Sequence, residues 1–234
     1  MNWAEDLCAF AVAQLGVEQR EALGARGVSD EQIDLYRIGY IDRILPVGLP
    51  EGFVTWARGG DKLDDVFVLP LTNSLGEVRG FQFRHVDRDR TGYQDYFLDR
   101  NEAVLFGLGQ AVPHMWRTRS VYLVEGAFDL FPVQRAYPGV FATLTSQVNP
   151  QTARLLKRLV QKVWMGYDMD GPGRLGCQEF EKKYGDEFQV YIVAYPRVKT
   201  VDGKLIKDPA DLWEVWGDSQ LKPFIQTVTQ SELF

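Results

Sequence analysis

The feature that most constrains this chain is a regular alternation of short apolar runs and helical segments over residues 120–195. The helical segments carry clear start signals, such as Asn149-Pro150, a capping residue followed by a proline at the first helical position. Strands and helices that alternate at this spacing predict a small parallel sheet with right-handed crossovers. We expect strands over residues 120–124, 140–144, 162–167 and 188–195, and helices over residues 128–137, 149–159 and 172–184.

The first half of the chain has a different pattern. Strand-like runs at residues 66–71 and 77–86 flank a turn and predict an antiparallel hairpin, to which residues 93–98 add a third strand. A helical spacing in residues 3–15 and a capping-box pattern at Ser29 predict flanking helices. The expected fold class is therefore α/β plus α+β: a small parallel-sheet, Rossmann-like domain preceded by a mixed α+β subdomain with antiparallel strands. We place the boundaries at residues 1–115, 116–207 and 208–234, the last being a short helical segment.

The composition narrows the class of protein. The chain has 234 residues, of which 45% are hydrophobic and 25% charged, so it can bury a substantial core. No apolar run approaches the roughly 20 residues of a membrane-spanning helix, and the N-terminus lacks the basic start of a signal peptide, so we expect a cytoplasmic protein. The two cysteines and two histidines lie far apart in sequence, which argues against a zinc site. Any metal must be held mainly by carboxylates, which favours magnesium or manganese.

The net charge of −6 does not by itself suggest a nucleic-acid protein. The first 65 residues contain twelve acidic and six basic residues, which accounts for the whole imbalance. Elsewhere the basic residues form local clusters, such as the one at residues 154–162. Such clusters are either solvated faces or phosphate-binding strips, and charge alone does not distinguish the two.

Acidic residues stand where the predicted parallel strands end. Glu125 follows the first strand directly, and Asp168 and Asp170 follow the third. Ligands of parallel sheets bind beyond the carboxyl ends of the strands, and residues i and i+2 of an extended chain point the same way. Asp129 lies one helical turn beyond Glu125, and Asp208 follows the fourth strand. Grouped carboxylates repel one another unless a cation neutralises them, so the pattern predicts a divalent-metal site. A lone aspartate at a strand end is more often a helix cap, and this reading stays open for Asp129.

These acidic segments, residues 124–129, 167–173 and 207–209, together resemble the Toprim domain shared by bacterial primases, topoisomerases and some nucleases. Asp168-x-Asp170 followed by Gly173-Arg174 is most similar to the DnaG-type primases. Residues 26–29, 38–40, 68–71, 76–84 and 105–108 are similar to the preceding part of the primase RNA-polymerase domain, so the resemblance covers roughly residues 25–215. It implies an enzyme of DNA replication, a primase-type DNA-directed RNA polymerase (a nucleotidyltransferase) that joins ribonucleoside triphosphates into short RNA primers on single-stranded DNA.

The resemblance also implies the site residues. Glu125, Asp168 and Asp170 would be catalytic and would hold Mg²⁺ or Mn²⁺, with Asp129 and Asp208 supporting the metal site. The reaction would be attack of a ribose 3′-hydroxyl on the α-phosphate of the incoming nucleotide, with Glu125 a candidate to take the proton. The residues expected to contact the nucleotide or the nucleic acid are Arg84, Arg79, Thr145, Ser146 and Arg174.

The chain also departs from the family pattern. Asp95 and Asn101 stand near positions where the family carries basic residues, and Asp208-Pro209-Ala210-Asp211 replaces the family's Asp-Pro-Asp. We expect the zinc-binding and helicase-binding modules to be absent, so that a replicative helicase and a separate zinc-ribbon protein would act as partners. A compact phage, plasmid or mobile-element protein fits this arrangement. The alternatives are a Toprim-type metal-dependent nuclease, or a non-catalytic nucleic-acid-binding replication protein.

Overall fold

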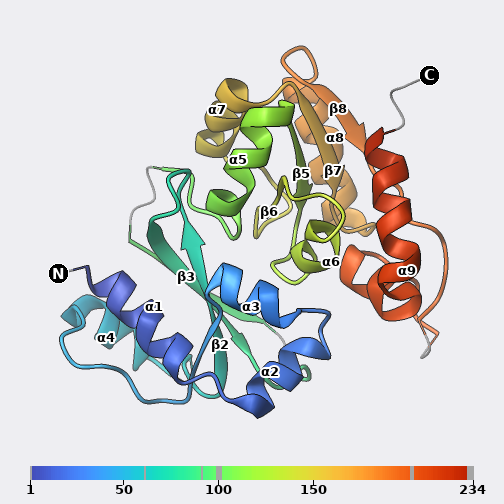
Figure 1. The fold of residues 1–234 in the computed structure, drawn as a ribbon. Coiled ribbons are helices and arrows are strands. Elements are labelled where there is room, and N and C mark those ends of the chain that lie inside the picture. The colour runs from blue at the N-terminus through green and yellow to red at the C-terminus, as the bar shows by residue number, and fades with distance from the viewer. Residues whose placement is uncertain (1, 61, 91, 99–101, 201–202, 231–234) are drawn as a thin grey trace.

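The computed structural model describes residues 2–60, 62–90, 92–98, 102–200 and 203–230. These residues form an antiparallel sheet and a parallel sheet that lie beside each other, with helices around both (Figure 1). The strands are β1 (Gly39–Ile41), β2 (Val66–Thr72), β3 (Val78–His85), β4 (Tyr93–Phe97), β5 (Ser120–Val124), β6 (Val140–Ala142), β7 (Lys162–Gly166) and β8 (Gln189–Ile192). The helices are α1 (Trp3–Ala13), α2 (Val17–Gly24), α3 (Asp30–Tyr36), α4 (Glu51–Ala57), α5 (Leu108–Thr118), α6 (Leu130–Gln134), α7 (Pro150–Leu159), α8 (Gly171–Tyr184) and α9 (Pro209–Gln230).

The antiparallel sheet has the strand order β1-β2-β3-β4. The predicted hairpin is confirmed: β2 pairs with β3 in antiparallel register, with a bulge between Leu71 and Thr72, and β4 adds the third predicted strand. The short strand β1 was not predicted, because three residues carry too little alternation to identify a strand. Helix α1 covers this sheet with its buried residues at the helical spacing Ala4, Leu7, Cys8 and Ala11.

The parallel sheet has the order β6-β5-β7-β8, and all its pairs are parallel, as predicted. Side chains of β5 alternate between two cores. Val121 and Leu123 face the core formed with α5, α7 and α8, whereas Tyr122 and Val124 face a core that includes α6 and α9. Strands β5, β6 and β7 are therefore buried on both faces, whereas β8 is largely exposed, and the strand ends are the places left for side chains to meet a ligand.

Several element limits differ from the sequence prediction. Helix α6 covers five residues instead of the ten expected, and the fourth strand of the parallel region is only β8, Gln189–Ile192. Helix α5 was not predicted. It contains Pro113, which removes a backbone donor, and it is stabilised by its apolar face (Leu108, Ala111, Met115) against the parallel sheet. The predicted boundary between residues 115 and 116 falls inside α5, and the division into three segments stays a prediction.

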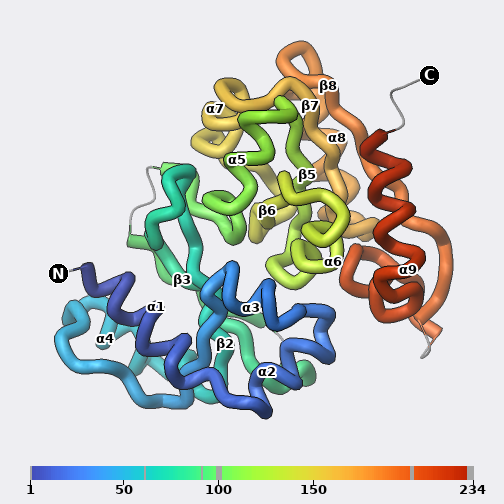
Figure 2. Tube along the Cα trace, in the orientation of Figure 1, coloured from blue at the N-terminus to red at the C-terminus, as the bar shows by residue number. Residues whose placement is uncertain are grey.

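The C-terminal segment is helical as expected, but α9 is 22 residues long and kinked at Gly217, where φ is 59°. Figure 2 shows the chain running from β8 down the outer side of the molecule into α9, which packs beside α6. No helix of the described residues is long and apolar enough to span a membrane.

One of the hydrophobic cores is shared by the two sheets. Tyr36, Phe67 and Phe106 from the first half pack in the same cluster as Leu130 and Phe131 of α6. Gln32 of α3 donates a buried hydrogen bond of 2.8 Å to the Phe131 carbonyl, so the contact between the halves is polar as well as apolar. This packing fixes β3 and β4 next to the carboxyl ends of the parallel strands.

Candidate metal and nucleotide site

A cavity of about 390 Å³ opens where the parallel strands end against β3 and β4. We call it the acidic cavity. Its ionisable lining includes the carboxylates of Glu125, Asp129, Asp168, Asp208 and Asp211 and the cationic groups of Arg84 and Lys207. The acids come from the turn after β5, the turn after β7 and the start of α9, three segments that only the fold brings together.

Glu125 follows β5 and is the least satisfied acid of the cavity. Its Oε2 is buried and has no hydrogen-bond partner. Burial, reinforced by the charges of Asp168 and Asp170, raises the pKa of Glu125 to about 7. A carboxyl group in this state releases its proton readily when a cation arrives.

Asp129 connects the turn after β5 with the start of α9 through hydrogen bonds. Its Oδ2 accepts a hydrogen bond of 3.0 Å from the Gly126 amide, and its Oδ1 accepts one of 3.3 Å from the Ala210 amide. A Cβ atom at position 126 would collide with this carboxylate, so the close approach requires glycine. Burial and the charges of Asp208 and Asp168 raise the pKa of Asp129 well above its usual range. Both oxygens are engaged by backbone donors, so Asp129 positions the two segments.

Asp168 and Asp170 follow β7, but their environments differ. Asp168 lines the cavity and accepts a 2.8 Å hydrogen bond from Lys207 Nζ. Asp170 is exposed, and its Oδ1 accepts a 3.0 Å bond from the Gly173 amide as the cap of α8. Asp170 does not line the cavity, although its charge still acts on Glu125.

Asp208 and Lys207 come from the segment that leads into α9. Asp208 Oδ1 caps α9 by accepting a 2.7 Å bond from the Asp211 amide, and its Oδ2 lies 3.4 Å from Lys207 Nζ. Burial, with the charges of Asp211 and Asp168, raises the pKa of Asp208 to about 6. Burial opposes the charge of Lys207, but the contacts with Asp168 and Asp208 outweigh it and raise the Lys207 pKa.

The donor set suits a hard divalent cation. Among the described residues, no three His, Cys, Asp or Glu side chains already converge as a metal-binding group, and Lys207 lies between two of the acids. The buried, unpartnered Glu125 oxygen and the raised carboxyl pKa values nevertheless mark an excess of negative charge that such a cation would relieve. Glu125, Asp168 and Asp208 line one cavity, so they fit a carboxylate-held ion; their assignment as ligands stays a prediction.

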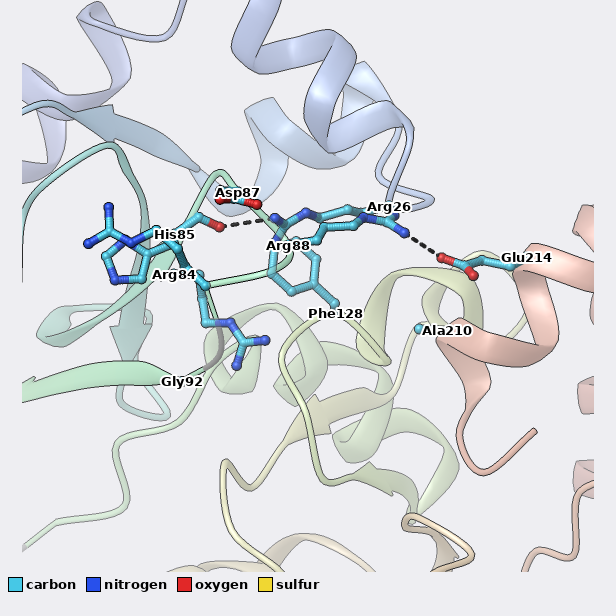
Figure 3. Close-up of a pocket in the computed structure, with 10 residues that line it drawn as sticks. Arg26, Arg84, His85, Asp87, Arg88, Gly92, Phe128, Ala210 and Glu214 are labelled. Carbon is cyan, nitrogen blue, oxygen red and sulfur yellow. Dashed lines mark hydrogen bonds and ion pairs between the residues drawn. The ribbon is translucent and has the colours of Figure 1, made fainter. Parts of the chain in front are cut away.

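A second cavity, of about 320 Å³, adjoins the first and is rich in arginine (Figure 3). We call it the basic cavity. The Arg26 guanidinium lies 5.4 Å from the Phe67 ring centroid and 4.9 Å from that of Phe128, and it donates to the carbonyls of His85 and Val86. Stacking on aromatic rings and bonding to carbonyls hold this charge in place, and among the described residues no carboxylate forms an ion pair with it.

Arg84 belongs to both cavities. Its guanidinium lies 5.6 Å from the ring centroids of Tyr93 and Phe128. Burial lowers the pKa of Arg84, and burial together with the charges of Arg88 and Arg84 lowers the pKa of Arg26 to about 10. Both side chains remain cationic at neutral pH and would gain from an anionic ligand.

The remaining predicted contact residues lie outside both cavities. Arg79 is held by Glu77 at 2.9 Å and by Glu102 at 3.2 Å. Thr145 is exposed beside a neighbouring cavity that also contains Asp95, and the Ser146 carbonyl packs against Gly176 of α8. Arg174 is exposed on the first turn of α8. Their roles stay predictions, and Asn101 lies outside the described residues.

Arg26 and Lys207 were not predicted as site residues. Both belong to short segments already compared with the primases, residues 26–29 and 207–209. Their place in the cavities depends on contacts over long sequence separations, such as Arg26 with Val86 and Lys207 with Asp168. The sequence feature that could have identified them is that each is the basic first residue of its segment.

Comparison with known proteins defines the class. Residues 122–205 match a protein family described as Toprim-like. The match begins within β5 and includes Glu125, Asp168 and Asp170, so the acidic ends of β5 and β7 lie inside the Toprim-like segment.

Relatives with assigned names extend the comparison to nearly the whole chain. The DNA primase of Deinococcus radiodurans is 26% identical over 235 residues, covering 89% of this chain and 41% of that protein. The DNA primase of Thermotoga maritima is 23% identical, covering 93% of this chain and 41% of that protein. The chain thus spans less than half the length of the curated relatives it matches.

Solved structures agree with this fold. The chain superposes on a structure of the Aquifex aeolicus primase containing zinc-binding and RNA polymerase domains with a TM-score of 0.73 at 22% identity, covering 96% of this chain and 59% of that one. The E. coli primase catalytic core gives a TM-score of 0.73 at 19% identity, covering 98% and 82%. The chain therefore has the fold of the DnaG-type primase catalytic cores and is similar in sequence to bacterial DNA primases, which agrees with the resemblance.

Proposed function

We propose that this chain synthesises short RNA primers on single-stranded DNA from ribonucleoside triphosphates. The observation that carries the proposal is the shared wall of the two cavities, where Arg84 and Phe128 line both the acidic and the basic side. A nucleoside triphosphate with bound divalent ions presents both charges, and its chelated phosphates would lie across this wall.

The basic and acidic residues of the two cavities would bind different parts of the substrate complex. Arg84 and Arg26 would bind phosphate oxygens, since guanidinium groups match phosphates in charge and geometry. Glu125, Asp168 and Asp208, with Asp170 close to Glu125, would hold Mg²⁺ or Mn²⁺. When bound, such an ion supplies charge neutralisation of the triphosphate and a more acidic ribose 3′-hydroxyl. Glu125, which lines the same cavity, is our candidate to accept the proton of that hydroxyl.

Template selection and coupling to unwinding would come from partners. We propose that the chain works with a zinc-ribbon protein and a replicative helicase, the partners that the resemblance to the primases suggests. Single-stranded DNA would approach the acidic cavity past β4 and the loop that carries Thr145 and Ser146.

One assay tests the proposal. The protein is incubated with single-stranded DNA, labelled ribonucleotides and Mg²⁺ or Mn²⁺, and the products are separated by size, without and with helicase and zinc-ribbon proteins. We expect short RNA oligomers. Shortened DNA would instead support the nuclease alternative, and no product under either condition would contradict the proposal.

A matched pair of variants ties the product to the site. Asp168→Asn removes a carboxylate of the acidic cavity and is expected to abolish synthesis while the far-UV circular dichroism stays native. Asp186→Asn removes one exposed carboxylate just beyond α8 and should keep wild-type synthesis. Continued synthesis by Asp168→Asn would show that the site is placed wrongly.

A further inference from the structure

We propose that Lys207 is a built-in counter-ion of the acidic cavity that competes with the divalent cation for Asp168 and Asp208. This inference rests on the metal site of the proposed function. It assigns to Lys207 the role of a positioning residue that holds the carboxylates together before metal enters and weakens the affinity of the site for metal.

The contacts of the ammonium group carry the proposal. Lys207 Nζ lies 2.8 Å from Asp168 Oδ2 and 3.4 Å from Asp208 Oδ2. The side chains of these two aspartates are only 15% and 11% exposed, so their charges are poorly screened by water. The ammonium therefore bridges the turn after β7 and the start of α9, where a shared cation would otherwise be required.

The backbone of Lys207 is fixed beside the acids. Its carbonyl accepts a 2.7 Å hydrogen bond from the Met169 amide, between Asp168 and Asp170. Its own amide donates a 3.2 Å bond to Asp211 Oδ2. The main chain cannot move away without breaking both bonds, whereas the side chain is half exposed and can swing out on its flexible stem. Exchange of ammonium for metal thus needs a side-chain movement alone.

The competition follows from charge. A divalent ion bound by Asp168 and Asp208 would share their oxygens with the ammonium or lie close to it, and like charges repel strongly in a partly buried site. Removing the Lys207 charge should therefore tighten metal binding. It should also leave the metal-free cavity with an uncompensated group of carboxylates, which lowers the stability of the metal-free protein.

Direct metal binding is the test. Mn²⁺ binding is titrated by calorimetry and by electron paramagnetic resonance for the wild type, Lys207→Gln and Lys207→Met, the last keeping an apolar stem in place. We expect both variants to bind Mn²⁺ about tenfold or more tightly than the wild type, a change of about 1.4 kcal/mol. Lys182→Gln, which removes one exposed lysine charge from α8, should bind as the wild type does. Equal or weaker Mn²⁺ binding by both Lys207 variants would overturn the inference.

Thermal unfolding gives a second readout that does not depend on activity. In the presence of chelator, Lys207→Gln should unfold several degrees below the wild type, and saturating Mn²⁺ should remove that deficit. A metal-free variant as stable as the wild type would mean that the ammonium does not stabilise the acidic cavity.

The outcomes separate this inference from the proposed function. If Asp168→Asn abolishes Mn²⁺ binding but the Lys207 variants bind Mn²⁺ with wild-type affinity, the role proposed for Lys207 is contradicted and the proposed metal site is supported. If the Lys207 variants bind Mn²⁺ more tightly but no RNA is made with any partner, the counter-ion role stands and the primase proposal falls. If none of these proteins binds Mn²⁺, both are wrong.

Discussion

The acidic and basic cavities are adjacent, yet they hold like charges together by different means. In the acidic cavity, backbone amides bind Asp129 and Asp208, and Lys207 supplies a counter-charge. In the basic cavity, aromatic rings and backbone carbonyls hold Arg26, and no carboxylate in the described part of the chain is bonded to it. The basic side is thus prepared for an anion, whereas the acidic side already contains a cationic group, Lys207, which we propose that a metal would displace.

The pKa shifts run in opposite directions in the two cavities. Burial raises the pKa of Glu125 and lowers that of Arg26, so each group is held in an environment that disfavours its own charge. A net charge of −6 averages these regions and conceals both. Local arrangement, and not total charge, therefore decides whether such a chain can bind an anionic substrate.

The largest effect is expected for Glu125→Gln. Removing the carboxylate should lower primer synthesis by about 100-fold or more, because a metal ligand and a proton acceptor are lost together. The same change removes a disfavoured buried charge, so the metal-free protein should unfold at an equal or higher temperature at pH 8. Synthesis assays and thermal melts check both halves. A large loss of stability would show that Glu125 holds the fold together instead of serving the site.

Arg84→Ala tests the wall shared by the cavities. Loss of charge-assisted bonds to phosphate should reduce synthesis by about 10- to 100-fold, mainly through weaker nucleotide binding. Arg84→Lys should recover part of the activity, since the charge remains but the planar donors do not. Steady-state kinetics with varied ribonucleotide concentration measures the effect. Unchanged kinetics for Arg84→Ala would show that Arg84 does not bind the nucleotide.

The pH dependence of stability separates the acidic cavity from the basic one. Glu125 and Asp208 have folded-state pKa values of about 7 and about 6, above the ordinary carboxyl values of about 4 in the unfolded chain. The folded protein then binds more protons between these limits, so the stability of the metal-free protein should fall as pH rises from about 4.5 to 7.5. Thermal melts in chelator across this range should show the slope, and Glu125→Gln should flatten it. Saturating Mn²⁺ should oppose the slope, because metal binds the deprotonated acids.

Arg79→Ala is the matched comparison for Arg84. The ion pairs with Glu77 and Glu102 are partly exposed to solvent, so their loss should change stability by about 1 kcal/mol or less and synthesis by less than about threefold. Thermal melts and the same kinetic assay check this. A loss of synthesis as large as that of Arg84→Ala would mean that Arg79 breaks its ion pairs with Glu77 and Glu102 and binds nucleic acid.

The smallest effect is expected at the rim of the basic cavity. Glu214 pairs with Arg88 at 2.8 Å, and both side chains are about half exposed. Glu214→Gln should release Arg88 and tighten the binding of single-stranded DNA by about two- to threefold at low salt, with little change in unfolding temperature. Fluorescence anisotropy at several salt concentrations measures the effect. Weaker binding would show that the ion pair organises the cavity for its ligand.

The sequence alone determined the alternation of strands and helices over residues 120–195 and the acids at the ends of the parallel strands. Period-two alternation and cap residues such as Asn149 act over a few neighbours, so they are visible in the chain itself. They predicted the parallel sheet and the β2–β3 hairpin correctly. Helix α5 was missed because Pro113 argues against a helix locally, and packing on the parallel sheet overrides that preference.

Only the tertiary structure decided which charges meet. Arg26 reaches β3 across some 60 residues, and Lys207 reaches Asp168 across 39, distances over which no periodic pattern operates. The same packing directs Arg79 to its glutamates and Arg84, five residues later on the same strand, into the cavities. Side-chain pairing depends on the summed packing of both sheets, and for that reason the members of each cavity follow from the fold and not from any single motif.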